Sequence, residues 1–292
     1  MSSRISRRAL LNVACGGAAA ATSARSAAAA SPVPPTAADA ATELYYRDDW
    51  LGEPWRMPEA VMLIHGVYES SIAWYGWVPR MAQQFRVLRP DLPGSGRSPI
   101  PAGFEWSLSS LTSTLARFLD RVGVESVHVV GAKFGGSIAM QFAADYPKRT
   151  RTLVVVSGPV SRPVIATPPP EGAPQGARLG SGAPKEQVDY WNAMMAASNR
   201  EASQGAGRVL AAMDLEPVVP RISAPTLVVT SDRSPLQSVD AVMRYQRKIP
   251  DSRLLVLASD AYHVAVVKAD ECVTGVMAFI EEVRARQPTA AR

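Results

Sequence analysis

Cysteine and histidine are scarce in this chain of 292 residues, which contains 2 Cys and 3 His. The histidines lie far apart in the sequence, so they show no spacing typical of a metal-ligand set. No glycine-rich phosphate loop or dinucleotide-binding motif occurs either. The sequence therefore predicts a protein that works without a metal ion and without an organic cofactor.

An excess of charge of one sign is also missing from most of the chain. The formal net charge is +5, but residues 1–30 contain four arginines and no acid. The rest of the chain carries 27 basic and 26 acidic residues. This balance gives no electrostatic reason to expect nucleic acid or an anionic membrane as a partner. A small-molecule substrate is the expected partner, and the composition indicates no oligomeric state.

Long apolar runs are absent, and the modest run from 9 to 21 is too short for a stable membrane anchor. It follows a basic start and precedes small residues, as in an export signal that is removed. Ser6-Arg7-Arg8-Ala9-Leu10-Leu11 resembles a twin-arginine signal. We interpret residues 1–30 as this signal, with the twin-arginine export machinery as a partner and the periplasm or the exterior as the location. A disordered alanine-rich tail is the alternative.

Lipid attachment at Cys15 is disfavoured, because Asn12 stands where a lipoprotein signal carries an aliphatic residue. Without residues 1–30 the chain keeps only Cys272, so an internal disulfide is not expected.

After a linker at 31–42, short apolar segments alternate with helical patterns. Strands are expected at 43–47, 60–64, 85–89, 126–130, 152–156, 226–230 and 253–257, and helices at 107–122, 138–144, 237–248 and 266–284. Buried strands that alternate with helices predict an α/β fold, with a mostly parallel sheet covered by helices on both faces.

Residues 161–216 interrupt this alternation. The segment starts rich in proline and glycine, continues with aromatic residues and methionines at 187–197, and has a second helical pattern at 207–213. We interpret it as a small, partly mobile insertion over one edge of the sheet. A disordered loop is disfavoured, because these large apolar side chains need a surface to cover.

Three strand ends carry residues suited to chemistry, and ligands of open α/β sheets bind beyond such ends. The first is His65-Gly66-Val67, where glycine permits a tight turn and the Val67 N–H faces the pocket. The second, from Gly131 to Gly136, has the glycine spacing of a nucleophile elbow, with Lys133 at its tip. The N–H of Phe134 would complete an oxyanion site with Val67. The third end brings His263 within reach of the elbow.

From about residue 43 to 285 the chain resembles the α/β-hydrolase fold family. The resemblance rests on the His65-Gly66 turn, the loop 91–98, the glycine-framed elbow, the strand at 225–229 and the late His263. It implies a core formed by 43–160 and 217–288, with 161–216 as a small cap insertion that shapes the substrate pocket.

The elbow residue departs from the family pattern. Lys133 occupies the position of a nucleophile that is usually Ser, sometimes Cys or Asp. Ser234 stands where the family often has the acid of its triad, which leaves Asp232 and Asp260 as other possible partners of His263. Acylation of a lysine amine would give a stable amide, so we do not expect ester hydrolysis through an acyl-Lys133 intermediate.

Three interpretations of Lys133 stay open. Burial could keep it a neutral amine that acts as a base or forms a Schiff base with a carbonyl substrate. It could instead stay cationic and bind an anionic or enolate oxygen, while His263 acts as general acid or base. In the third, the catalytic machinery is lost and the pocket binds a ligand or partner.

The first two interpretations are favoured, because a buried lysine is costly and a loss of function would more simply leave a small residue. We therefore predict an exported α/β-hydrolase-fold enzyme for a small carbonyl or acyl substrate, with hydrolase or C–C lyase or decarboxylase chemistry. A catalytically inactive homologue that binds a ligand or partner is the alternative.

Three further residues are candidates for the substrate pocket: His65, Trp74 and Trp191. For the two tryptophans, packing in the core is an equally good explanation. His65 is expected to support the oxyanion turn rather than to act as an acid or base.

Overall fold

The computed structural model describes residues 43–162 and 176–286. The predicted export signal and linker lie outside these residues, and so does part of the predicted cap, 163–175. All the described residues belong to one unit of the chain, residues 36–292.

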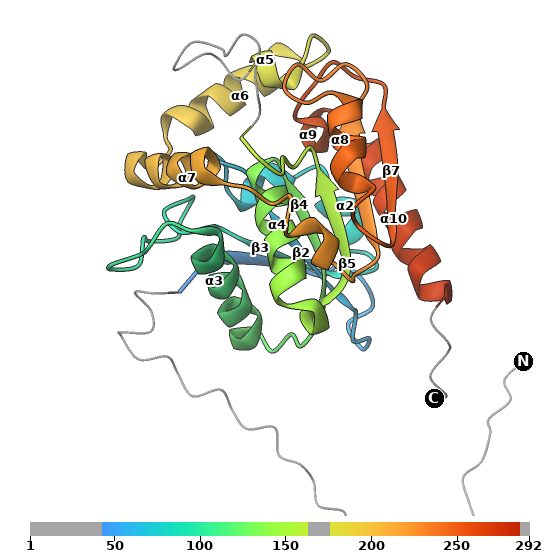
Figure 1. Ribbon diagram of the computed structural model, residues 1–292. Helices are drawn as coiled ribbons and strands as arrows, with labels where there is room; N and C mark the ends of the chain where they lie inside the picture. The colour runs from blue at the N-terminus through green and yellow to red at the C-terminus, as the bar shows by residue number, and fades with distance from the viewer. Residues whose placement is uncertain (1–42, 163–175, 287–292) are drawn as a thin grey trace, which may run out of the picture. The chain divides into compact units, whose positions relative to one another are not determined.

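The centre of this unit is a seven-stranded sheet in the order β1-β3-β2-β4-β5-β6-β7 (Figure 1). Only β1 is antiparallel to its neighbour, and every other pair is parallel. The strands are β1 Tyr46–Asp49, β2 Ala60–Ile64, β3 Arg86–Pro90, β4 Val127–Ala132, β5 Thr150–Val156, β6 Thr226–Ser231 and β7 Ser252–Leu257. The mostly parallel sheet predicted from the alternation of strands and helices is thus confirmed. The expected first strand, 43–47, was placed about three residues too early.

Helices cover both faces of the sheet, as predicted. The helices α3 Leu108–Arg121, α4 Phe134–Asp145 and α8 Val239–Gln246 contribute buried side chains to one face, and α2 Val78–Met81, α9 Val264–Val267 and α10 Ala269–Arg286 contribute to the other. The side chain of Ser107 caps α3 by accepting from the N–H of Ser110 at 3.0 Å. Three short 3-10 helices, Ser71–Trp74, Pro147–Arg149 and Val219–Arg221, lie in the connections.

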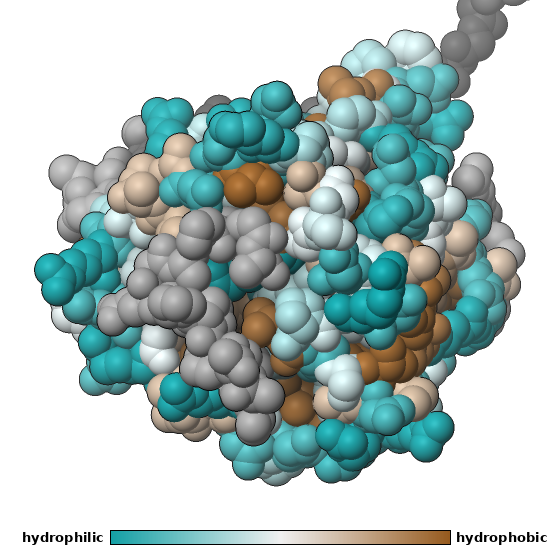
Figure 2. Space-filling view, turned by 90° about the horizontal axis from the view of Figure 1, so that it is seen from above, coloured by the Kyte–Doolittle hydropathy of each residue, from teal (hydrophilic) through white to brown (hydrophobic). Residues whose placement is uncertain are grey.

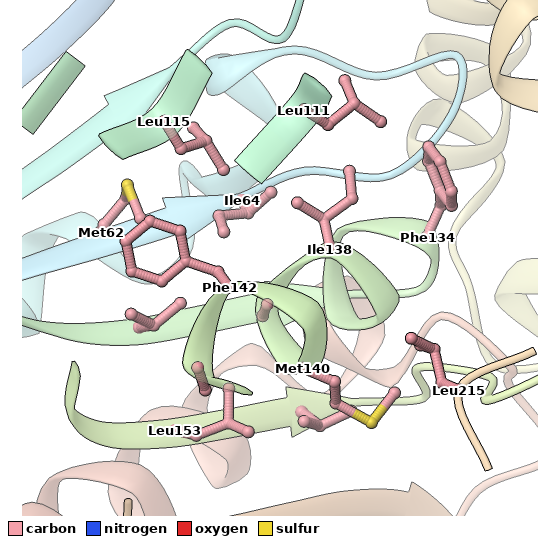
Figure 3. Close-up of a cluster of buried hydrophobic side chains, with 14 of the residues drawn as sticks. Met62, Ile64, Leu111, Leu115, Phe134, Ile138, Met140, Phe142, Leu153 and Leu215 are labelled. Carbon is pink, nitrogen blue, oxygen red and sulfur yellow. The ribbon is translucent and has the colours of Figure 1, made fainter. Parts of the chain in front are cut away.

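Successive residues of the central strands belong to opposite faces of the sheet, which is why these strands read as continuous apolar runs. Met62 and Ile64 of β2 pack with Leu115 and Ile138 from α3 and α4 (Figure 3). Val61 and Leu63 instead join the cluster that includes residues of α2 and α10. The central strands are held firmly from both sides, so their carboxyl ends form a rigid base for a site.

In the described part of the predicted cap, between β5 and β6, lie the helices α5 Gly176–Leu179, α6 Lys185–Ala196 and α7 Arg200–Ala212. They lie beyond the carboxyl ends of the strands (Figure 1). The helical pattern at 207–213 marks only the second half of α7. Asn199 caps α7 by accepting from the N–H of Ala202, and Gly205 lets the helix pack against the ring of Trp106. The glycines of α7 hid its true start from the sequence pattern.

None of the helices in the described ranges has the length and apolar composition that a membrane span requires.

Two glycines give a matched test of this packing. A Cβ on Gly135 would lie 2.1 Å from the backbone oxygen of Ile64, whereas a Cβ on Gly207 would meet nothing within 4 Å. We expect Gly135→Ala to destabilise the protein by about 2 kcal/mol or more through overpacking. Gly207→Ala should stabilise it by about 0.5–1 kcal/mol, because alanine favours a helix interior. Urea unfolding measures both, and equal effects of the two substitutions would contradict the close contact between α4 and β2.

Candidate functional site

The elbow between β4 and α4 holds Lys133 in an unusual backbone conformation, with φ 54° and ψ −121°. Such angles are rare for a residue with a side chain and are found where a fold fixes a functional group. Gly131 permits the turn, because a Cβ there would lie 2.1 Å from the carbonyl oxygen of Gly135. The elbow predicted from the glycine spacing therefore forms, with Lys133 at its tip.

The ammonium of Lys133 forms an ion pair with the carboxylate of Glu69, a residue that sequence reasoning missed. The amine Nζ donates to Oε1 of Glu69, and Oε2 of the same carboxylate accepts from the N–H of Gly66 at 2.9 Å. Only 9% of the Lys133 side chain and 2% of the Glu69 side chain are exposed. The two ends of the predicted oxyanion site, the turn at Gly66 and the elbow, are thus joined by a buried charge pair.

One feature of the sequence was available for finding Glu69. A carboxylate three residues after the turn glycine can fold back onto the N–H of that glycine, as an acceptor in a tight turn does. Nothing in the sequence indicated that Glu69 pairs with Lys133, because the two residues are 64 positions apart.

The imidazole of His263 also faces Glu69. Its Nε2 lies 3.0 Å from Oε1 of the carboxylate, although the N–H direction is off the line of a good hydrogen bond. No group in the described part of the chain forms a hydrogen bond with Nδ1. The ring packs edge-on against Trp191 at a centroid distance of 5.7 Å, and the N–H of His263 donates to the carbonyl of Arg178 at 2.9 Å. His263 and Lys133 are therefore brought together, with Glu69 between them.

The charge states in this cluster follow from burial and from the neighbours. Burial alone would raise the pKa of Glu69, but the charge of Lys133 and its hydrogen bond outweigh that effect and hold the pKa well below its usual value. Burial lowers the pKa of His263, and the charge of Lys133 lowers it further, against the opposite effect of Glu69. Near neutral pH the site thus contains a carboxylate and a neutral imidazole.

The three other candidate partners of His263 form contacts elsewhere. Asp232 accepts from the N–H of Ser259 at 2.8 Å, and Asp260 accepts from the N–H of Ser181 at 3.0 Å. Ser234 accepts from the N–H of Leu236 at 3.4 Å. Within the described ranges, the carboxylate that meets the imidazole is that of Glu69.

Two neighbouring hollows open at the cluster and share the two residues of the expected oxyanion site. The first, of about 480 Å³, is lined by Glu69, and the second, of about 360 Å³, by Lys133; Val67 and Phe134 line both. The described hydrogen bonds use neither the N–H of Val67 nor that of Phe134. Both groups are therefore available to an oxygen atom of a ligand. Figure 2 shows this end of the molecule from above, with hydrophobic side chains in patches among hydrophilic ones.

His65 lies behind the oxyanion turn rather than in either hollow. The N–H of Leu92 donates to its Nε2 at 3.0 Å, which leaves Nδ1 to donate to the carbonyl of Gly66 at 2.8 Å. Burial lowers the pKa of His65, so the ring is a neutral brace. It joins the turn to the loop 91–98, in which the carboxylate of Asp91 accepts from the N–H groups of Ser71 and Arg97.

The two candidate pocket tryptophans have different surroundings. Trp74 packs edge-on against Trp77 at 5.0 Å, within the cluster that α2 and α10 share. Trp191 reaches the site through its contact with His263. Neither ring lines the two hollows.

A search of the described residues finds no group of three or more His, Cys, Asp or Glu that could hold a metal ion.

Comparisons with known proteins agree with this architecture. A family model for the alpha/beta hydrolase fold matches residues 59–182. A 2-hydroxy-6-oxo-2,4-heptadienoate hydrolase of Pseudomonas putida is 34% identical over 99 residues, which are 33% of this chain and 36% of that protein. A 2-hydroxymuconate semialdehyde hydrolase of a Pseudomonas species is 35% identical over 108 residues, 36% and 38% of the two chains. The chain spans well under half the length of the relatives it matches.

Among solved structures, an enol-lactonase from Burkholderia xenovorans superposes with a TM-score of 0.72 at 19% identity. The match covers 82% of this chain and 96% of that one. At this identity the likeness concerns the fold.

A double-mutant cycle tests the ion pair. Lys133→Met leaves the carboxylate of Glu69 buried without its cation, and Glu69→Gln leaves the ammonium without its anion. We expect each single change to cost about 3–5 kcal/mol, and the double variant to recover most of that loss. Chemical denaturation of the four proteins measures this coupling. Additive losses in the double variant would show that the two groups do not interact.

The pH dependence of stability follows from lowered pKa values at His263 and Glu69. Below about pH 6.5, the unfolded chain binds a proton at His263 that the folded form does not, so stability falls as the pH falls. The stabilisation from Glu69 is complete above the usual glutamate pKa near 4.5. It is lost as the pH falls through the lower pKa that Glu69 has in the folded protein. We expect unfolding titrations to show a loss of stability from pH 7 to 5, less steep in His263→Gln than in the surface control Lys148→Met. A free energy of unfolding that stays constant from pH 7 to 5 would contradict the burial of a neutral imidazole at His263.

Proposed function

Because this chain has the α/β-hydrolase fold, we propose that the cluster of Lys133, Glu69 and His263 is the active centre of a cofactor-free enzyme for a small carbonyl or acyl compound. The observation that carries the proposal is that these three ionisable side chains meet, buried, beside Val67 and Phe134, which line a hollow and whose N–H groups take part in no described hydrogen bond. A fold that needed only stability would more simply fill this position with apolar side chains.

Lys133 acts as a cation in this proposal. An ammonium that faces a buried carboxylate is stabilised in its charged form, which argues against a Schiff base on its amine. The side chain runs along the oxyanion turn, since a Cβ on Gly66 would lie 3.0 Å from Cε of Lys133. A substrate oxygen held by the N–H groups of Val67 and Phe134 would therefore lie beside a positive charge. Negative charge that develops on that oxygen in the transition state is then stabilised.

His263 transfers protons. The imidazole is neutral near pH 7, so it can take a proton from water or from the substrate and return it later. The carboxylate of Glu69 stabilises the imidazolium that forms, as the acid of a catalytic triad does. Glu69 lies at Nε2, so Nδ1, which has no hydrogen-bond partner among the described residues, is the nitrogen that exchanges the proton.

The reaction that fits these groups forms no covalent bond between the substrate and the protein. The oxygen of a carbonyl group is polarised by the two N–H groups and the ammonium. A water molecule deprotonated by His263 attacks the carbon atom, or His263 moves a proton as a neighbouring C–C bond breaks. The relatives named as a dienoate hydrolase and a semialdehyde hydrolase support a carbonyl or acyl substrate.

Turnover of an enol lactone, an aryl ester and a 1,3-diketone tests this function. We expect Lys133→Met to lower kcat/KM on a converted substrate by about 10²–10³-fold, and His263→Gln by about 10²–10⁴-fold. Lys148→Met is the matched surface control, and borohydride should trap no adduct on Lys133.

The double variant Lys133→Met/Glu69→Gln shows whether the loss is chemical, because it removes both charges without leaving one buried alone. If this folded double variant and His263→Gln keep full activity, the site has been assigned wrongly. If borohydride links a substrate to Lys133, the lysine is a nucleophile and not a cation.

A second candidate function, a catalytically inactive protein that binds a ligand, has its own support. Glu69 already neutralises Lys133, and Nδ1 of His263 lacks an acid partner within the described ranges. This alternative is correct if no compound is turned over while a ligand still binds in the hollows.

We also propose that the protein is exported by the twin-arginine route, on the basis of Arg7 and Arg8 in the segment 6–11. Arg7→Lys/Arg8→Lys should retain the protein in the cytoplasm, where fractionation detects it. Export of this variant at the normal level would contradict the proposal.

A further inference from the structure

The second hollow, the one lined by Lys133, is rich in positive charge. Three basic residues line it, Lys133, Arg162 and Arg178, and no Asp or Glu is among its described lining residues. The carboxylate of Glu69, a residue that lines the first hollow, neutralises the charge of Lys133. Neither arginine has an ion-pair partner within the described part of the chain. Among the described residues, the positive charge of the two arginines close to the elbow is therefore not balanced by an acid.

Arg178 is held beside the active centre by its backbone. Its carbonyl accepts the N–H of His263 at 2.9 Å, and the next residue, Leu179, is fully buried. Gly180 has φ +77° and packs against the loop at Asp260, whose carboxylate accepts from the N–H of Ser181. The segment that carries Arg178 is thus fixed to the loop that carries His263.

Arg178 lines the second hollow, and its charge affects the ionisable groups nearby. Burial raises the pKa of Tyr262 and lowers that of His263; the charge of Arg178 opposes the first shift and adds slightly to the second. Tyr262 also lines the hollow. Arg162 is more exposed and lies at the rim, where it also lines a neighbouring depression.

The remaining wall is mostly apolar. Pro159, Leu210, Ala211 and Leu236 contribute to it, and the volume of about 360 Å³ suits a small molecule. An apolar wall beside two arginines fits a ligand with a hydrocarbon segment and one planar anionic group, because the guanidinium fork matches a carboxylate. The N-terminus of α4 adds its own positive potential at Phe134.

We propose that the second hollow binds the carboxylate of the substrate through Arg178, with Arg162 at the rim, and holds an apolar segment of the same molecule against Leu210 and Leu236. This inference rests on the proposed function and narrows its substrate to a carboxylate-bearing carbonyl compound. The carboxylate would be bound at Arg178 while the carbonyl oxygen lies at Val67, Phe134 and Lys133. Arg178 is therefore a specificity residue that acts by binding.

Equilibrium binding of three probes of similar size tests the inference without any turnover. The probes are hexanoate, hexanamide and hexan-1-amine, which share one hydrocarbon chain and differ in head group. Titration calorimetry or ligand-observed NMR should show hexanoate binding about tenfold or more tighter than hexanamide, and no binding of the amine.

Arg178→Gln should weaken hexanoate binding by about 10- to 100-fold and leave hexanamide unchanged, because the lost contact is a charge-assisted hydrogen bond. Arg162→Gln should have a smaller effect that decreases with added salt. Arg208→Gln is the matched control, because this exposed arginine of α7 does not line the hollow. Thermal unfolding checks that each variant is folded.

Equal binding of hexanoate and hexanamide, or unchanged hexanoate binding in folded Arg178→Gln, would overturn the inference. If inorganic phosphate binds as tightly as hexanoate, the hollow binds anions in general, and the proposed selectivity for a carboxylate is wrong. The two proposals fail separately: carboxylate binding that depends on Arg178 without any turnover refutes only the catalytic function. Turnover with no preference for carboxylates refutes only this inference.

Discussion

The buried ion pair between Lys133 and Glu69 is the constraint on which the site depends. Removing two charges from water is costly, and only close pairing with further hydrogen bonds offsets that cost. The N–H of Gly66 and the imidazole of His263 supply further contacts to the same carboxylate. The pair therefore fixes three separate parts of the chain: the turn after β2, the elbow after β4 and the loop after β7.

The electrostatics of the site follow from this pairing. Glu69 stays ionised, because its partners outweigh the effect of burial, and His263 stays neutral, because burial and the nearby ammonium disfavour its protonation. An ordinary member of the fold activates a hydroxyl group at the elbow. This chain places a positive charge there instead, which suits the stabilisation of an oxyanion better than attack on a carbonyl carbon. The arginines of the second hollow extend that preference for negative charge along one wall.

Much of the fold was predictable because its determinants are local. Continuous apolar runs indicated the strands, and the glycines at 131, 135 and 136 indicated the elbow, whose tight backbone approach excludes side chains. Ser107 and Asn199 cap the starts of α3 and α7. Only α3 was predicted with its correct start, because only its residues show a clear apolar pattern of helical spacing. The spacing from Gly66 could have marked Glu69 as an acceptor in the turn, but its pairing with Lys133 could not be foreseen, because the two residues are distant in sequence. For the same reason, the contacts of Asp232 and Asp260 with loop backbone could not be foreseen.

The ionisation state of Glu69 is the most direct measure of the ion pair with Lys133. Infrared difference spectra between the wild type and Glu69→Gln isolate the carboxyl band of this one residue. We expect a carboxylate band that persists when the pH falls below 4.5, the usual pKa of glutamate, and that is lost at a higher pH in Lys133→Met. A protonated carboxyl band in the wild type near neutral pH would show that Lys133 and Glu69 do not form an ion pair, and the proposed active centre would have to be abandoned.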